Sequence, residues 1–244
     1  MWDGIDFGLV WDSLPDLLNG LIVTVELTLL TTLGGLIVSV PLGILRASRF
    51  RWASRAIWVY TYFFRGTPTL IQLFLIYYGL AEFDFIRKSG LWPFLREGYW
   101  CCVLAFTLNT AAYTIEIIAG AIRNVHRDDI DAARALGLSK RLIMQRIVLP
   151  KALRIMLPAY ANEVIFVLQS TSLASVVTVL DLTGVARVIV SHTFSPYEIF
   201  ITIGLIYLAS TYLALWLFRL WEARLFRHLK NPDSHLTQTV PVLR

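Results

Sequence analysis

The sequence predicts an all-α polytopic membrane protein, and two observations carry that prediction. Hydrophobic residues make up 57% of the 244-residue chain and charged residues 16%, with a mean hydropathy of +0.63. Soluble domains hold about 45–50% apolar and about 25% charged residues. The apolar residues also gather into runs that reach the ~20 residues an α-helix needs to cross a membrane. Five such spans are expected: residues 20–46, 56–80, 99–122, 156–181 and 197–220.

The charges of the connecting segments orient these spans. Residues 1–19 carry aspartates and no lysine or arginine, while the first connection holds four arginines within residues 46–55. The segment 123–154 and the segment after the fifth span are also basic. Because positively charged loops stay on the cytoplasmic side of a membrane, we expect the N-terminus outside and the C-terminus in the cytoplasm.

The expected organisation follows from these two patterns. An extracytoplasmic N-terminal segment (1–19) precedes a five-span transmembrane domain (20–225) with a cytoplasmic loop (123–154), and a cytoplasmic tail (226–244) follows. The net charge of +5 comes from basic residues between the apolar runs, so topology explains it better than nucleic-acid binding. The histidines and the adjacent Cys101 and Cys102 show no metal-ligand spacing, so no metal site is expected.

The basic loop contains the most informative pattern in the chain. It reads Asp131-Ala-Ala, three residues, Gly137, nine residues, then Ile147-x-Leu149-Pro150. A polar insert of this length between two apolar runs suits contact with another protein. A generic basic loop that only fixes topology is the alternative.

Helical spacing predicts two short helices within this pattern. Ala132, Ala133 and Leu136 share one face of a short helix and form a small apolar patch. Gly137 ends that helix or lets another backbone approach closely. A second helix is expected to start near Ser139 and to end at Pro150, since proline cannot continue a helix from within.

The spacing resembles the EAA loop of the membrane-spanning subunits of bacterial ABC importers. Asp131 stands where that family usually has glutamate, and Asp128-Asp129 stands where Gly-Gln or Gly-Glu is common. Both departures keep or add acidity at the start of the helix, where carboxylates offset the helix dipole. The effect of Asp131 on docking strength stays open.

Three further segments resemble the subgroup of these subunits that imports polar amino acids. They are Arg65-Gly66-Thr67-Pro68, then Asn109 to Tyr113 with Glu116, then Asn162-Glu163 with Ser170-Thr171-Ser172. The resemblance covers roughly residues 20–225 and is closest to permease subunits for histidine, lysine, arginine, ornithine and the related opines. It implies a type I importer-like fold with a cytoplasmic coupling helix, working in a bacterial inner membrane by alternating access.

The resemblance also implies partners and a set of coupling residues. The partners would be an ATPase dimer, a second identical or homologous permease subunit, and a periplasmic amino acid binding protein. The chain has no G-x-x-x-x-G-K-[ST] phosphate loop, so ATP and Mg would be bound by the partner ATPase and this chain would be no enzyme and hold no cofactor. The residues implied in ATPase coupling are Asp131, Ala132, Ala133, Leu136, Gly137, Ile147, Leu149 and Pro150.

Polar residues within the spans are candidates for a substrate pathway. An ionisable group at membrane depth costs ~2.5–3.5 kcal/mol on insertion scales, so each needs an interior partner or a water-filled cavity. Carboxylates there would suit a cationic amino acid. Glu163 is the strongest candidate, whereas Glu116 could equally lie at the membrane interface. The full set is Glu163, Asn162, Gln169, Ser170, Thr171, Ser172, Asn109 and Glu116.

A second group of span residues is expected to be structural. Gly66 and Pro68 predict a kink in the second span. Arg65 beside them is expected to pair with a buried carboxylate rather than with substrate. A local helix break at Ser170–Ser172 would expose backbone carbonyls.

Two other functions compete with the importer. An ATP-independent secondary amino acid carrier or channel would explain acidic residues in the spans, but it leaves the Ala132–Pro150 pattern without a purpose. A membrane enzyme finds no support, because no catalytic or metal-ligand cluster is visible. The sequence leaves open which amino acid or opine is carried, whether the pore is a homodimer or a heterodimer, and whether this subunit contacts substrate.

Overall fold

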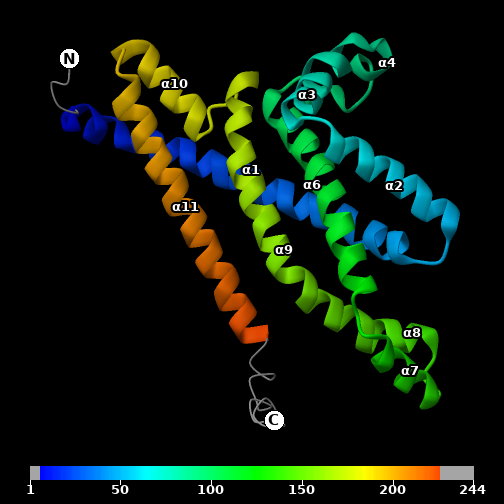
Figure 1. Ribbon diagram of the computed structural model, residues 1–244. Coiled ribbons are helices and arrows are strands. Elements are labelled where there is room, and N and C mark those ends of the chain that lie inside the picture. The colour runs from blue at the N-terminus through cyan, green and yellow to red at the C-terminus, as the bar shows by residue number, and fades with distance from the viewer. Residues whose placement is uncertain (1–5, 226–244) are drawn as a thin grey trace, which may run out of the picture.

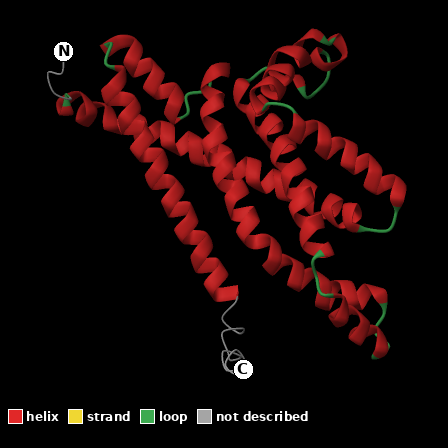
Figure 2. Cartoon of the chain, in the orientation of Figure 1, coloured by secondary structure: helices red, strands yellow, loops and turns green. Residues whose placement is uncertain are grey.

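The computed structural model describes residues 6–225, and within that range the chain contains helices and connecting loops without a strand (Figure 2). The α-helices are α1 (Phe7–Ala47), α2 (Arg51–Gly66), α3 (Thr69–Phe74), α4 (Asp84–Arg87), α5 (Trp92–Leu95), α6 (Gly98–Arg123), α7 (Arg127–Ala135), α8 (Lys140–Ile143), α9 (Leu149–Ser170), α10 (Leu182–Thr193) and α11 (Pro196–Leu225). Two π-helical turns, η1 (Leu75–Gly79) and η3 (Met144–Val148), and two 3₁₀ segments, η2 (Leu80–Glu82) and η4 (Thr171–Val177), join some of them.

Helix α1 is the central helix of the fold, and α6 packs along it. Figure 1 shows α1 crossing behind α9, α11 and α6, with α7 and α8 projecting at the opposite end of the molecule from the N-terminus. Glycines allow the close approach of α1 to α6: a Cβ on Gly35 would lie 2.6 Å from Thr110 Cγ2, and one on Gly43 would lie 2.7 Å from Ile118 Cγ2. Small residues at such contacts are typical of helix packing in membranes.

Three described helices are long and apolar enough to cross a membrane, namely α1, α6 and α11. A fourth span results if the bent pair of residues 140–177 and 182–193 counts as one. The first, third and fifth expected spans therefore correspond to α1, α6 and α11. Helix α1 begins at Phe7, inside the segment that we expected to precede the first span.

The second expected span, 56–80, is wrong as a single helix. Helix α2 ends at Gly66, Thr67 is extended (φ −117°, ψ 146°), and α3 starts after Pro68. The cause is local, because the proline ring disfavours a helical conformation of the preceding residue and supplies no N–H. The kink predicted at Gly66 and Pro68 is thus a complete break.

The fourth expected span, 156–181, also differs from the structure. Helix α9 already starts at Leu149 and gives way at Thr171 to η4, and α10 then leaves at an angle of 47°. Pro150 does not end the helix before it, as we expected, but lies in the first turn of α9. The π-helical turn η3 ends at Val148, directly before α9, and such turns are typical of interruptions within a helix.

Candidate functional sites

Helix α7 ends in a hydrogen-bonded motif that fixes the direction of the chain into α8. The Gly137 N–H donates to the Arg134 carbonyl at 2.9 Å, and the Leu138 N–H donates to the Ala133 carbonyl at 3.1 Å. Gly137 adopts φ +78°, the left-handed conformation that this Schellman motif requires and that glycine tolerates best. Ser139 then caps α8, its side chain accepting from the Leu142 N–H at 3.4 Å. We call residues 127–143 the α7–α8 lobe.

The α7–α8 lobe is attached to α9 on its inner side. Ala133 is buried and belongs to an apolar cluster that includes Ile143, Val148 and Ala152. Asp129 in the first turn of α7 forms an ion pair with Lys151 of α9 at 2.6 Å. These contacts make the lobe an extension of the α9 helix rather than a free loop.

The outer side of the lobe presents apolar side chains. Leu136 is 81% exposed, and Ala132 beside it is exposed as well. Together with Ala133, Ile147 and Pro150, they line an open cavity of about 430 Å³ between α7 and the start of α9. The structure thus gathers five of the eight residues implied in coupling around one hollow, with the charged side chains of Asp129, Arg146, Lys151 and Arg154 at its wall.

The remaining coupling residues have other surroundings. Asp131 is exposed and bonds Arg134 one turn along the same helix at 2.7 Å. It is therefore not a cap: α7 starts at Arg127, and Asp128 and Asp129 are the acidic residues of its first turn. Leu149 is half-buried in the first turn of α9.

A second polar site holds the break between α2 and α3. The Gln72 amide donates to the Phe64 carbonyl at 2.8 Å and to the Thr67 carbonyl at 3.0 Å. Asn109 on α6 donates to Gln72 Oε1 at 2.9 Å. The two buried amides therefore satisfy carbonyls that the break leaves without helical partners, and Asn109, expected on a substrate pathway, has a structural partner.

Glu163 lies at the contact of α9 with α6. It accepts a 2.8 Å hydrogen bond from the Thr110 hydroxyl and is partly exposed. Asn162 and Gln169, expected beside it on the pathway, are exposed on α9. Glu163, in the fourth span expected from the sequence, is thus a partly exposed carboxylate without an ion pair among the described residues.

Two ionisable residues have partners that differ from those expected. Glu116 accepts from Arg46 Nε at 2.9 Å and from the Thr61 hydroxyl at 2.9 Å, so it joins α6 to α1 and α2. Arg65 makes no direct ion pair with a carboxylate among the described residues, although its charge acts on Glu163. Its guanidinium lies 5.3 Å from the centre of the Tyr113 ring, a cation–π contact.

The chain beyond α9 contains a second break. The Thr171 and Ser172 hydroxyls, at the start of η4, donate to the carbonyls of Leu168 and Gln169 at the end of α9, both at 2.7 Å. Four residues after η4, the fully buried Asp181 caps α10, its carboxylate accepting from the N–H groups of Thr183 and Gly184. The α-helix thus ends at Ser170, where the break was predicted, but the chain continues as the 3₁₀ segment η4 and leaves the helical path only after Val177.

Several residues that organise these sites were given no role of their own in the sequence analysis. Gln72 and Thr110 make the contacts that place Asn109 and Glu163, and Thr24 on α1 accepts from the Leu182 N–H at 3.1 Å. Only the Asp181-Leu-Thr-Gly184 stretch carried a local signal, because an aspartate ahead of a helix is a common N-cap. No group of three or more His, Cys, Asp or Glu within residues 6–225 could hold a metal ion.

Comparisons with known proteins agree with this geometry. Residues 39–227 match the family described as binding-protein-dependent transport system inner membrane component. The chain is 45% identical to the nopaline transport system permease protein of Agrobacterium fabrum, over 93% of this chain and 94% of that protein. It is 43% identical to the histidine/lysine/arginine/ornithine transport system permease protein of Escherichia coli K12, over 89% and 92% of the two chains.

Solved structures extend the likeness to the fold. A chain in the crystal structure of an amino acid ABC transporter with histidines superposes with a TM-score of 0.81 at 32% identity, over 91% of this chain and 99% of that one. A chain of the inward-facing MetNI methionine ABC transporter superposes with a TM-score of 0.71 over 88% and 98% of the two chains. Its identity is 16%, so it speaks for the fold alone.

Proposed function

The chain belongs to the family of inner membrane components of binding-protein-dependent transport systems, and from this premise we propose that a partner ATPase drives it through the α7–α8 lobe. It is the permease subunit of an ABC importer of the amino acid type. Such a family works with a separate ATPase and a substrate-binding protein in a membrane. An ATP-independent carrier is not favoured, because it gives the lobe no role.

One observation carries the coupling proposal: the lobe combines a fixed inner side with an apolar outer side. The Schellman turn at Gly137 and the Asp129–Lys151 ion pair make it move with α9. The exposed Leu136 and the hollow beside it offer a surface into which a partner side chain can pack. A rigid protrusion on a membrane helix transmits displacement, because packed elements move as bodies.

The mechanism then follows as alternating access. Closure of an ATPase dimer on ATP pushes two such lobes, one on this chain and one on an identical or homologous permease subunit. The attached α9 helices turn and open the pore toward the side where the binding protein delivers substrate. Hydrolysis, with ATP and Mg held by the ATPase, releases the lobes and returns the pore to its inward state. Leu149, Pro150 and Ile147 link lobe and α9 in this cycle.

Replacing Leu136 with aspartate tests the docking surface. The L136D variant places a charge in the apolar patch without touching the helix core, since this side chain is 81% exposed. We expect the ATPase to be lost when the complex is purified through the permease. Leu91→Asp is the matched control, because Leu91 is 64% exposed in a connection expected on the opposite side of the membrane. Retention of the ATPase by L136D at the control level contradicts the docking role.

The cargo that we propose is a polar, basic amino acid or an opine. The relatives with 43% and 45% identity are permeases for histidine, lysine, arginine and ornithine, and for nopaline. Glu163, a carboxylate without an ion pair among the described residues, suits an ammonium or guanidinium group on the pathway. We expect arginine, histidine or ornithine to stimulate the ATPase of the reconstituted complex. Stimulation by acidic or small neutral amino acids alone contradicts this assignment.

The orientation that we propose puts the lobe and the C-terminus in the cytoplasm and the N-terminus outside. The basic residues around the lobe support it through the positive-inside rule. Single cysteines at Lys88 and Lys140, both exposed positions, test it with a membrane-impermeant thiol reagent on intact cells. Native Cys101 and Cys102 have no exposed surface and give no background. Labelling of K140C from outside contradicts the orientation.

A further inference from the structure

The corner between α1 and α2 contains an open cavity of about 680 Å³ to which the proposed function gives no role. No carboxylate is among the side chains around it. Four arginines therefore converge on one space beside a membrane-crossing helix. The lining residues are Arg46, Ser48, Arg49, Arg51, Ser54, Arg55 and Trp58.

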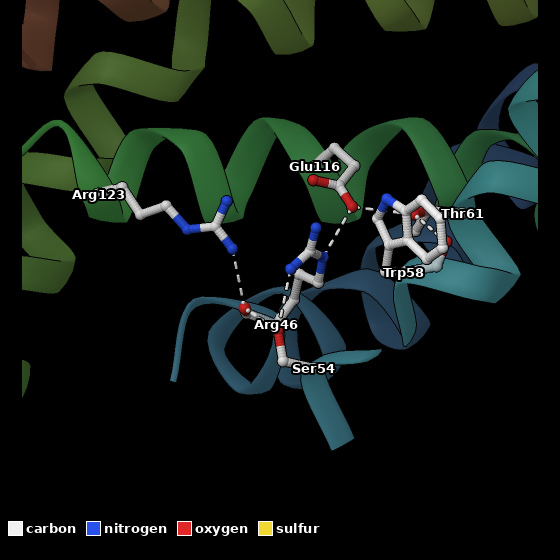
Figure 3. A network of polar contacts seen from close by, with 6 residues as sticks. All are labelled: Arg46, Ser54, Trp58, Thr61, Glu116 and Arg123. Carbon is white, nitrogen blue, oxygen red and sulfur yellow. Dashed lines mark hydrogen bonds and ion pairs between the residues drawn. The ribbon is translucent and has the colours of Figure 1, made fainter. Parts of the chain in front are cut away.

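One of the four arginines is already neutralised and braces the corner. Figure 3 shows Arg46 at the end of α1 between Glu116 on α6 and Ser54 on α2, with bonds of 2.9 Å to both. The other three, Arg49, Arg51 and Arg55, are exposed and form no ion pair with another residue in the described range. The cavity thus retains a positive charge that no side chain in the described range offsets.

The start of α2 adds to the same imbalance. Its N-cap residue, Phe50, makes no side-chain capping hydrogen bond, and its first turn has no acidic residue. Helix N-termini carry partial positive charge and favour anions. Arg51 and Arg55 add positive charge at a helix N-terminus, where a negative charge is normally favoured. An anion in the cavity would therefore offset the charge of the arginines and that of the helix N-terminus together.

The outward face of α2 indicates what kind of anion fits. Trp52 is 82% exposed and Tyr62 is 68% exposed, and the exposed Trp58 and Phe63 lie on the same helix. The opposite face, with Ile57 and Thr61, is buried. A helix with arginines and exposed tryptophans at one end and aromatic residues along one side matches the headgroup–acyl boundary of a bilayer.

We propose that this cavity binds the phosphate group of an anionic phospholipid. The guanidinium groups of Arg49, Arg51 and Arg55 would hold the phosphate, since planar guanidinium suits phosphate oxygens. The acyl chains would lie along the aromatic side of α2. The leaflet is that of the α7–α8 lobe, because Arg123, the last residue of α6, donates to the Arg46 carbonyl at 3.0 Å and α7 starts four residues later.

The test counts lipids on the purified complex, extracted from vesicles that mix phosphatidylglycerol with phosphatidylcholine. Native mass spectrometry should show phosphatidylglycerol retained in preference to phosphatidylcholine. The double variant R51Q/R55Q should reduce that preference by roughly ten- to thirtyfold, because it removes two charge-assisted contacts to the phosphate. R51K/R55K keeps the charge but loses the paired N–H groups, so it should retain less lipid than the wild type and more than R51Q/R55Q, which separates loss of binding from loss of folding.

A matched control removes the same charge elsewhere. Arg219 and Arg224 are exposed on the last turns of α11 and do not line the cavity, so R219Q/R224Q should keep the wild-type preference. Equal losses in both double variants, or no loss in R51Q/R55Q, overturn the proposal. A last arm uses phosphatidylcholine vesicles with millimolar inorganic phosphate. If the wild-type complex binds inorganic phosphate under these conditions and R51Q/R55Q does not, the cavity is a site for a soluble anion. That result would overturn the proposal of a phospholipid site.

Discussion

Two of the three turns with left-handed residues in the described range, those at Gly137 and Thr178, are held in different ways. Gly137, φ +78°, closes α7 through hydrogen bonds to residues within the preceding turns, and no atom lies within 4 Å of where its Cβ would be. Thr178, φ +67°, starts the turn into α10, which depends on distant partners. There the Leu182 N–H donates to Thr24, 158 residues away, and Tyr207 donates to Asp181 at 3.3 Å.

The difference separates a surface that contacts partners from a joint that supports the fold. The Gly137 turn is built from its own residues, so the lobe keeps its shape while its outer side stays free. The turn at Thr178 is a strained position for a β-branched residue and persists because the surrounding structure holds it. Damage at the first turn should therefore appear in transport, and damage at the second in stability.

Asp181→Ala should cause the largest loss of stability. It removes a buried cap and leaves the Thr183 and Gly184 N–H groups unsatisfied, a cost of about 2–4 kcal/mol. The thermal unfolding midpoint of the purified complex should fall by roughly 5–15 °C. Asp6→Ala is the control, because Asp6 caps α1 in the same way, accepting from Leu9, but is exposed. A similar small shift of the unfolding midpoint in both variants would show that the turn into α10 does not stabilise the fold.

Gly184→Ala should follow with an intermediate effect. A Cβ there would lie 2.3 Å from the Val179 carbonyl oxygen, so backbone must shift. Overpacking of this kind costs about 1–3 kcal/mol. Gly204→Ala in α11 meets no atom within 4 Å and should be neutral or raise stability by up to about 1 kcal/mol. Equal melting curves for the two alanine variants would contradict the tight packing inferred at the joint.

Asp129→Asn should have the smallest effect on unfolding. It breaks the ion pair between Asp129, whose side chain is 34% exposed, and Lys151, whose side chain is 44% exposed. Exposed ion pairs contribute about 0.2–1 kcal/mol to stability. Asp84→Asn, which breaks the more exposed pair with Arg87, provides the comparison. Only the Asp129 variant should reduce ATP-driven uptake, since only that pair ties the lobe to α9. Normal uptake in D129N would mean that apolar packing around Ala133 alone holds the lobe.

The features that the sequence predicted are those with local causes. The end of α7 at Gly137 and the spans corresponding to α6 and α11 follow from hydrogen bonding and hydropathy within short windows. The break at Pro68 was anticipated as a kink, since proline acts on its neighbour. The prediction that a helix ends at Pro150 was wrong. Proline often follows the end of a helix, but here Pro150 lies in the first turn of α9, after a π-helical turn.

The features that escaped prediction depend on contacts between distant segments. Glu116 pairs with Arg46, 70 residues away, so its role depends on how α1 lies against α6. Arg65 lies on the Tyr113 ring, and Gln72 reaches Asn109, through the packing of α2 and α3 on α6. The position of the α10 turn depends on Thr24 in α1. The spacing of residues along the chain does not predict such contacts between distant segments.

ATP-driven uptake by Gly137→Val is the most direct test of the lobe as coupling element. Valine at φ +78° is strained by about 1–2 kcal/mol, which lowers the ratio of the docking shape to other shapes by roughly five- to thirtyfold. Gly90→Val is the control, because Gly90 is exposed and no positive φ is found there. We expect G137V to insert and melt like G90V while its uptake in proteoliposomes falls by up to that factor. Uptake by G137V equal to that by G90V would contradict it.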